Sequence, residues 1–172
     1  PADAPSSTKR LIIPDAATTP NDPLITASAS STIKTLDIRT NGILNAGTSS
    51  QLTLVGNAGA WHSDGTFNAS TGKVIFNYGI VSEIVTISGS TDFYNIEVGP
   101  NTTFQPVPGT ILRIAGAGTA DVTSIVDFSS VNNTVEWNGA DQTIVNPNGI
   151  TPNSGYYHLI LSGSGTKTMP TT

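Results

Sequence analysis

The chain has 172 residues, of which 11% are charged and 37% are hydrophobic, and it contains no cysteine. A typical soluble domain carries about 25% charged residues, and here Thr, Ser, Asn and Gly stand in place of the missing charge. These residues form helices poorly, so the composition disfavours a helical bundle, and the many β-branched residues disfavour disorder. The length predicts one domain with a sizeable core.

The charge balance argues against two classes of partner. Seven Lys and Arg against twelve Asp and Glu give a net charge of −5, and only Lys9 and Arg10 are adjacent cations. A protein that binds nucleic acid or an anionic membrane surface needs a basic stripe, which this sequence lacks. The sequence contains no run of 18 apolar residues, so it predicts no membrane insertion. The lack of cysteine excludes disulfides and Cys-ligated zinc, and we expect no cofactor.

In chain order, residues 1–9 look like a leader or linker, and a single domain is expected over 10–172. Short apolar runs follow, each bounded by Gly, Asn, Pro or Ser. They lie at 11–13, 24–25, 33–38, 51–55, 73–77, 83–87, 94–98, 110–114, 122–128, 134–137, 142–145 and 157–161. Most alternate apolar and polar residues, as in Leu52 and Leu54, which places the apolar side chains on one face of a strand. The fold class is therefore all-β, with roughly a dozen short strands.

An internal repeat of about 60 residues narrows the architecture. Leu36 and Ile38 match Ile96 and Val98, and further apolar pairs match at offsets of 57 to 63. The repeats span approximately 33–92 and 93–155, with a partial copy at 156–172. We interpret each repeat as three coils of about 20 residues in a β-solenoid, or parallel β-helix, in which Leu36 stacks on Ile96. A β-sandwich, which also has strands at 8–12-residue spacing, is the alternative.

Turns and ends follow from the same interpretation. Asn and Gly at Thr40-Asn41-Gly42, Asn138-Gly139 and Asn148-Gly149 supply the positive φ values that corners require. The two ends of a solenoid expose unpaired strand edges. The proline-rich segment 14–23 could cover one of them, because proline cannot donate to a β-ladder.

A group of short strings gives a family resemblance. These are Leu11-Ile-Ile-Pro14, Gln51-Leu-Thr-Leu54, Gly65-Thr-Phe-Asn68, Gly72-Lys-Val-Ile-Phe-Asn77, Thr86-Ile-Ser-Gly89 and Phe93-Tyr-Asn-Ile96. Over about residues 10–169 the chain resembles the repeat region of large Bacteroidetes cell-surface, adhesin-like proteins exported by the type IX secretion system. The resemblance implies a secreted or cell-surface location and a role in a stalk or shaft. The sorting domain expected at the C-terminus is not in this sequence, and the chain begins with Pro1, so we expect a piece of a longer protein.

Few polar residues suggest chemistry. Trp61-His62-Ser63-Asp64 holds the letters of a hydrolytic triad, but a triad is defined by geometry and not by adjacency, and we expect a polar turn. His62 and His158 are the two histidines and lie at non-equivalent positions of the repeat, so no metal site is predicted.

Three carboxylates lie inside predicted strands. Alternation points Asp37, Glu97 and Glu136 outward as solvated charges. Asp37 and Glu97 would lie on one face three coils apart, roughly 14 Å, too far for a glycosidase pair.

The aromatic residues divide into core and surface candidates. Trp137 aligns with core-facing Phe76 and is assigned to the core. Trp61 has no counterpart in the second repeat and is the best candidate for an exposed aromatic residue that contacts a ligand.

Three function hypotheses stay open. The first is a non-catalytic extracellular structural module, a stalk, filament or adhesin-shaft segment. The second is a filament subunit that polymerises through its terminal strands, at Leu11, Ile12 and Ile13 and at Leu159, Ile160 and Leu161. The third is a carbohydrate-binding module that uses Trp61. The corresponding partners are copies of itself, flanking repeats or surface glycans, and no enzyme activity is expected.

Overall fold

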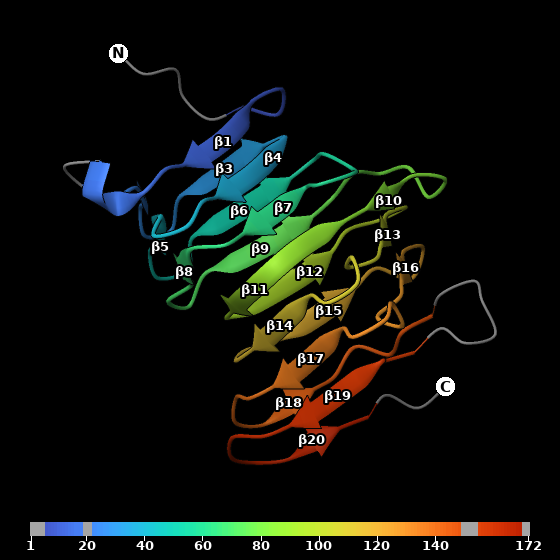
Figure 1. Ribbon diagram of the computed structural model, residues 1–172. Helices are drawn as coiled ribbons and strands as arrows, with labels where there is room; N and C mark the ends of the chain where they lie inside the picture. The colour runs from blue at the N-terminus through green and yellow to red at the C-terminus, as the bar shows by residue number, and fades with distance from the viewer. Residues whose placement is uncertain (1–5, 19–21, 149–154, 170–172) are drawn as a thin grey trace.

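The computed structural model describes residues 6–18, 22–148 and 155–169. The chain winds through about seven turns of a β-solenoid with roughly 22 residues per turn (Figure 1). Each strand pairs in parallel with a strand one coil away, for example β3 with β6 and β6 with β9. The predicted all-β solenoid is confirmed, and the alternative sandwich is not found. No helix in the described part of the chain is long and apolar enough to cross a membrane.

Each coil contributes, in chain order, to three faces of the solenoid. Face 1 contains β1 (Arg10–Ile13), β4 (Thr35–Ile38), β7 (Trp61–Ser63), β10 (Ile84–Val85), the first half of β11 (Ile87–Phe93), β13 (Thr103–Phe104) and β16 (Ile125–Val126). Face 2 contains β2 (Leu24–Ile25), β5 (Ile43–Ala46), β8 (Thr66–Asn68), the second half of β11, β14 (Ile111–Ile114), β17 (Thr134–Trp137) and β19 (His158–Leu161). Face 3 contains β3 (Ser30–Ile33), β6 (Gln51–Leu54), β9 (Lys73–Phe76), β12 (Asn95–Val98), β15 (Gly118–Ala120), β18 (Gln142–Thr143) and β20 (Lys167–Thr168).

Two segments at the start of the chain lie partly outside the described residues. Of the predicted leader, residues 1–5 are outside, and of the proposed proline-rich cap at 14–23, residues 19–21 are outside. Between them the chain forms the single-turn 3₁₀ helix η1 (Ala16–Thr18), which follows β1 directly.

The predicted stacking register is wrong, although the solenoid is right. Leu36 pairs with Leu11 and Trp61 on face 1, whereas Ile96 pairs with Val74 and Gly118 on face 3. The repeat seen in the sequence leads from β4 to β12, from β6 to β14 and from β9 to β17, eight strands in each case. A coil has three strands, so eight strands make two and two-thirds coils. The sequence repeat therefore matches each segment with a segment on a neighbouring face instead of one on its own face. It arises because every face needs the same inward–outward alternation.

The core is a column of inward side chains in which aromatic rings form a continuous row. Ring centroids are 5.0 Å apart for Trp61 and Phe93, 6.3 Å for Phe93 and Phe76, and 4.8 Å for Phe76 and Phe104. The row continues through Phe128 to Tyr156 near the C-terminal end. Tilted and edge-to-face pairs of this kind stabilise by about 0.5–1.5 kcal/mol each beyond the area they bury, so the rings tie together coils three to seven.

The corners use small polar residues as well as glycine. Ser28, Ser49 and Ser70 have φ values of 58°, 55° and 48° and lie at the same corner, between face 2 and face 3, in the first three coils. The predicted turn at Thr40-Asn41-Gly42 is confirmed with Asn41 at φ 58°. The predicted corner at Asn138-Gly139 is wrong, because neither residue has a positive φ. In the third predicted turn Asn148 has no positive φ, and Gly149 lies outside the described residues.

Gly89 is the corner where β11 passes from face 1 to face 2. Its φ is 89°, and a Cβ atom there would lie 1.9 Å from the backbone oxygen of Ser63 on the previous coil. Gly59 also has a positive φ, 65°, but a Cβ atom there would meet nothing within 4 Å. Substitution of Gly59 therefore tests the cost of a positive φ alone, whereas substitution of Gly89 adds the cost of a clash with the previous coil.

We predict that Gly59→Ala lowers the free energy of unfolding by about 1–2 kcal/mol, the cost of a left-handed non-glycine residue. Gly89→Ala lowers it by clearly more, because the methyl group must push two coils apart. Urea unfolding followed by circular dichroism measures both. Equal losses for the two variants would contradict the close approach at Gly89.

Tyr156 packs on the last aromatic ring of the core. It stacks on Phe128 at 5.1 Å and donates a hydrogen bond to the carbonyl oxygen of Val145. Burial raises the pKa of Tyr156 to about 12 from an ordinary 10.0, because the phenolate would lose its hydration. The folded state therefore favours the neutral phenol.

We predict that the contribution of Tyr156 to stability is complete below pH 10 and is lost as the pH rises from 10 to 12. Above pH 10 the unfolded chain releases the phenolic proton and the folded chain keeps it, so the loss reaches at most about 2–3 kcal/mol. The difference in unfolding free energy between the wild type and Tyr156→Phe, measured from pH 8 to 12, isolates the contribution of the Tyr156 hydroxyl group. A pH-independent difference would contradict it.

Candidate functional site

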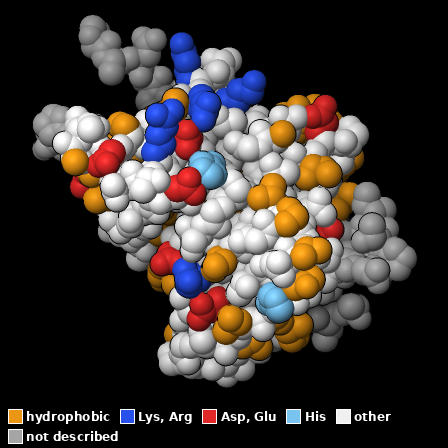
Figure 2. All heavy atoms as spheres, viewed as in Figure 1, with side chains coloured by type: hydrophobic (Ala, Val, Ile, Leu, Met, Phe, Trp, Pro, Cys, Tyr) orange, Lys and Arg blue, Asp and Glu red, His pale blue; other side chains and the backbone are white. Residues whose placement is uncertain are grey.

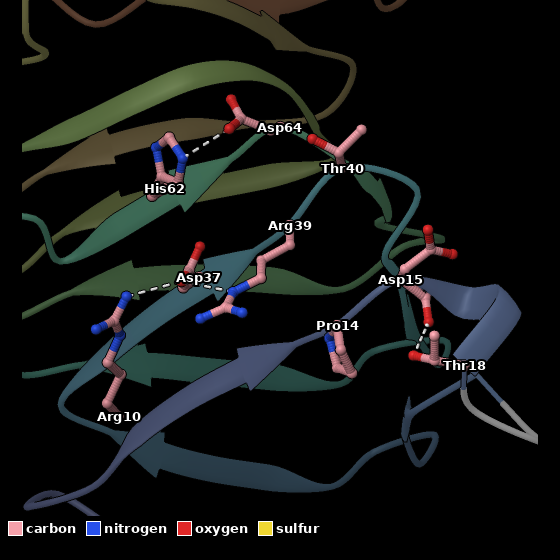
Figure 3. A pocket seen from close by; sticks show the side chains of 9 residues that line it. All are labelled: Arg10, Pro14, Asp15, Thr18, Asp37, Arg39, Thr40, His62 and Asp64. Atoms are coloured by element: carbon pink, nitrogen blue, oxygen red, sulfur yellow. Dashed lines mark hydrogen bonds and ion pairs between the residues drawn. The ribbon is translucent and has the colours of Figure 1, made fainter.

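An open groove of about 750 Å³ lies on the outer surface of face 1, at its N-terminal end (Figure 3). Strands β1, β4 and β7 and the segment around η1 supply the side chains that line it. These are Arg10, Pro14, Asp15, Thr18, Asp37, Arg39, Thr40, His62 and Asp64. Most are charged or polar, so the groove suits a polar occupant.

Parallel stacking places these groups in one row. The register aligns Ile12 with Asp37, Asp37 with His62, and His62 with Ser88. Strands in adjacent coils lie about 4.8 Å apart, and side chains at aligned outward positions therefore become vertical neighbours. The row is a consequence of the fold and needs no loop to assemble it.

Asp37 is held by two arginines. Its Oδ2 accepts a hydrogen bond from Nη2 of Arg10 at 2.7 Å and lies 3.6 Å from Nε of Arg39. The Asp37 side chain is only 10% exposed, although it points outward as predicted. The guanidinium groups cover it, so Asp37 is an ion-paired residue and not the freely solvated charge that alternation predicted.

His62 links two polar neighbours, as Figure 3 shows for one of them. Its Nδ1 is 2.7 Å from Oγ of Ser88, and its Nε2 is 3.0 Å from Oδ2 of Asp64. The predicted polar turn is wrong, because Trp61–Ser63 forms β7. Alternation in this strand buries Trp61 and Ser63 and leaves His62 outside.

The Ser–His–Asp geometry resembles a hydrolytic triad in its contacts. The His62 and Asp64 side chains are, however, 42% and 55% exposed. A triad holds its carboxylate buried, where it orients the imidazole. Of the two contacts, the one between His62 and Ser88 joins the third coil to the fourth on the outer face.

The groove lies within the most basic part of the surface. Four of the seven cations of the chain, Lys9, Arg10, Lys34 and Arg39, belong to the first two coils. Figure 2 shows Lys and Arg side chains gathered at this end of the face. The surface charge is thus unevenly distributed along the solenoid axis.

Trp61 is not the exposed ligand contact that the sequence suggested. It is 0% exposed, packs against Phe67 and Phe93, and donates from Nε1 to Oγ1 of Thr91 at 2.9 Å. Its inward position follows from the register, which aligns it with buried Leu36 and Ile87. The carbohydrate-binding hypothesis therefore loses the residue on which it depended. Trp137, assigned to the core, is also 0% exposed, and that assignment is confirmed.

The other predicted carboxylates are spread over different faces. Asp37 lies on face 1 and Glu97 on face 3, where Lys73 Nζ donates to Glu97 Oε2 at 2.7 Å. The prediction that these two share one face is wrong, for the same reason as the register. Glu136 lies on face 2 beside Arg113, with Nε and Oε2 3.3 Å apart. In the described ranges no three His, Asp or Glu side chains group closely enough to hold a metal ion.

The two segments proposed as terminal strands form β1 and β19. Within the described residues β1 pairs with β4 alone, and β19 pairs with β17 alone. Ile13 is buried, whereas Ile12, Ile160 and Leu161 are exposed. Leu11 and Leu159 are partly buried.

Comparison of the chain with protein-family models, with curated proteins and with solved structures finds no match.

The buried contact between Trp61 and Thr91 gives a test of the corrected placement. We predict that Thr91→Val lowers the free energy of unfolding by about 1–3 kcal/mol, because it leaves the indole N–H buried without an acceptor. Trp61→Phe also destabilises, but the double variant costs less than the sum of the singles, since no polar group is then left unpaired. Chemical unfolding of the four proteins gives the coupling energy. Additive losses would contradict the hydrogen bond.

Proposed function

We propose that this chain is a non-catalytic structural segment of an extracellular or cell-surface protein, forming part of a stalk, filament or adhesin shaft. The observation that carries the proposal is the single column of about seven parallel coils with one uninterrupted core. In such a column each coil is held by its neighbours, and length is gained simply by adding coils.

The outer surface supports this role, because its polar side chains bond from coil to coil. Asn68 donates to Asn45, Lys73 to Glu97, and Arg113 to Asp92, in each case across one coil boundary. Contacts of this kind oppose bending and shear between coils. A surface whose polar groups are used in this way has fewer of them free to bind a substrate.

The groove on face 1 is consistent with the same role. Its two arginines are engaged with Asp37, and His62 is engaged with Asp64 and Ser88. The proposed location depends on the resemblance to Bacteroidetes surface repeats exported by the type IX route.

Distance measurement between spin labels tests the rigid shaft. The chain has no cysteine, so Thr32→Cys and Thr119→Cys introduce the only two labels. The register places these positions in one outward row of face 3, four coil steps apart through Thr53, Ile75 and Glu97. The Cα atoms of the two positions should lie about 19 Å apart, since each step is about 4.8 Å. We therefore predict one narrow distribution of label-to-label distances near this value.

A matched variant lacking one coil provides the control. Lys73 is aligned with Asn95, so deletion of residues 73–94 removes one full turn. The same label pair should then shorten by about 5 Å with an equally narrow distribution. A broad distribution in the parent chain would overturn the rigid shaft. Antibody labelling of intact producing cells tests the location, and signal only after lysis would overturn it.

A further inference from the structure

The strands of face 2 form two separate ladders. One ladder joins β2, β5 and β8, and the other joins the second half of β11 to β14, β17 and β19. No backbone hydrogen bond joins β8 to β11, and the structure describes every residue of both strands. This break between the third and the fourth coil is called the seam below.

The seam arises because the two coils take different paths over face 2. The register aligns Ser63 with Gly89 on face 1 and Lys73 with Asn95 on face 3. The third coil advances ten residues from Ser63 to Lys73, which form a corner and then β8. The fourth coil advances six residues from Gly89 to Asn95, and there β11 continues from face 1 onto face 2 as one strand. The two segments differ in length, so their backbones do not meet in register.

The polar side chains beside the seam turn away from it. Asn68 on β8 donates to Asn45 of the previous coil. On the other side of the seam, Ser90 and Asp92 of β11 accept from Arg113 of the following coil. Hydrogen bonding on the outer surface of face 2 thus continues within each ladder and stops at the seam.

The space along the seam is incompletely filled. Two cavities, of about 320 Å³ and about 190 Å³, lie along it, and both are lined by Phe67 and Asp92. Between residues 64–70 and residues 90–94, all of which the structure describes, there is no hydrogen bond or ion pair. The two strands are therefore held together by apolar contact.

That contact is made by aromatic rings in the core. Phe67 of β8 and Phe93 of β11 have ring centroids 6.0 Å apart, and the Trp61 ring lies 5.0 Å from each of them. The indole of Trp61 also donates to Thr91 of β11. Opening of the seam would separate these groups and expose the indole N–H.

Face 3 has a break of its own, and that break is bridged. Among the described strands β15 is not paired with β18. Gln142 of β18, however, donates from Nε2 to the carbonyl oxygens of Ile114 and Gly116, at 2.8 Å and 2.7 Å. The two strands at the seam share no comparable bond.

We propose that the seam is a joint, at which face 2 opens between the third and the fourth coil while faces 1 and 3 hold the two parts of the column together. Bending that stretches face 2 acts there on a boundary without backbone pairing, so this boundary opens before the others. On face 1 β7 stays paired with β11, and on face 3 β9 stays paired with β12. The aromatic contact closes the joint again when the load is removed. The inference rests on the proposed structural function and adds to the shaft a place where it yields.

Hydrogen exchange of the two indole N–H groups tests the joint in the wild-type chain. Trp61 and Trp137 are the two tryptophans, and both are 0% exposed. Trp61 lies at the seam, whereas Trp137 lies on β17, which is paired on both sides. We expect the Trp61 indole to exchange faster than that of Trp137 by about tenfold or more, measured by NMR in heavy water, because a local opening costs less than global unfolding. Urea below the unfolding transition should accelerate Trp61 only weakly, since the opening exposes little surface.

A matched pair of variants locates the opening. Phe67→Leu weakens the contact that closes the seam and should accelerate exchange at Trp61. Phe104→Leu makes the same change in the aromatic row of the fifth coil, away from the seam, and should leave the exchange rate of Trp61 unchanged. Circular dichroism confirms that both variants keep the fold.

Other results would overturn the proposal. Equal exchange rates for the two indoles, faster exchange at Trp137, or an equal response of Trp61 to both variants would show that face 2 does not open at the seam. The spin labels at positions 32 and 119 give a separate answer, because they lie on face 3, where β9 and β12 stay paired. Equal indole rates with a narrow distribution would leave a rigid shaft without a joint, whereas fast exchange at Trp61 with a broad distribution would leave the joint and remove the rigid shaft.

Discussion

The structure depends on one constraint, the parallel pairing of each strand with a strand one coil earlier and one coil later. The backbone donors and acceptors of a strand are satisfied by its neighbours in the column, and its side chains meet those at aligned positions about 4.8 Å away. This explains why polar groups occur in outward rows such as Asp37, His62 and Ser88 and why apolar groups occur in inward rows such as Leu36, Trp61 and Ile87. It also explains the low charge content, because like charges at adjacent levels of a row would repel each other.

Alternation along the sequence is sufficient to predict strands and to indicate a solenoid, but not to set the register. Every face buries one set of alternate residues, so a segment of face 1 resembles a segment of face 3 as closely as it resembles its own neighbour. Coil length varies as well, since the coil from Ile84 to its partner Thr103 is shorter than the coil from Trp61 to its partner Ile87. The difference between these two coils is nearly the length of one face. An alignment that allows small insertions can therefore change faces without losing the apolar matches.

The candidate site shows the same limit at the level of single residues. The repeat predicts a surface position for Trp61 because this residue lacks a counterpart in the second copy, yet its true partners, Leu36 and Ile87, lie one coil away on either side. Sequence reasoning misses the groove because Arg10, Asp37 and His62 come from three coils and no short motif contains them. The sequence does contain one signal for the groove, because a polar residue recurs at an outward position once per coil. This recurrence can be recognised only when the coil length is known. The core assignment of Trp137 is correct although Phe76 lies on another face. The comparison requires only that both residues occupy inward positions of their strands, and this holds on every face.

The properties of the first and last coils follow from the contacts that hold the inner coils together. A solenoid is held together by contacts between neighbouring coils, and an inner coil has such a contact on both sides. Proteins that must stay apart protect such edges with charged side chains, proline or a covering segment. Here Leu24 and Ile160 place apolar groups at the two ends of an outer face on which Asn45 and Glu136 are their polar neighbours. The same stacking that makes the column rigid thus leaves its first and last coils with strands that pair on one side alone within the described residues.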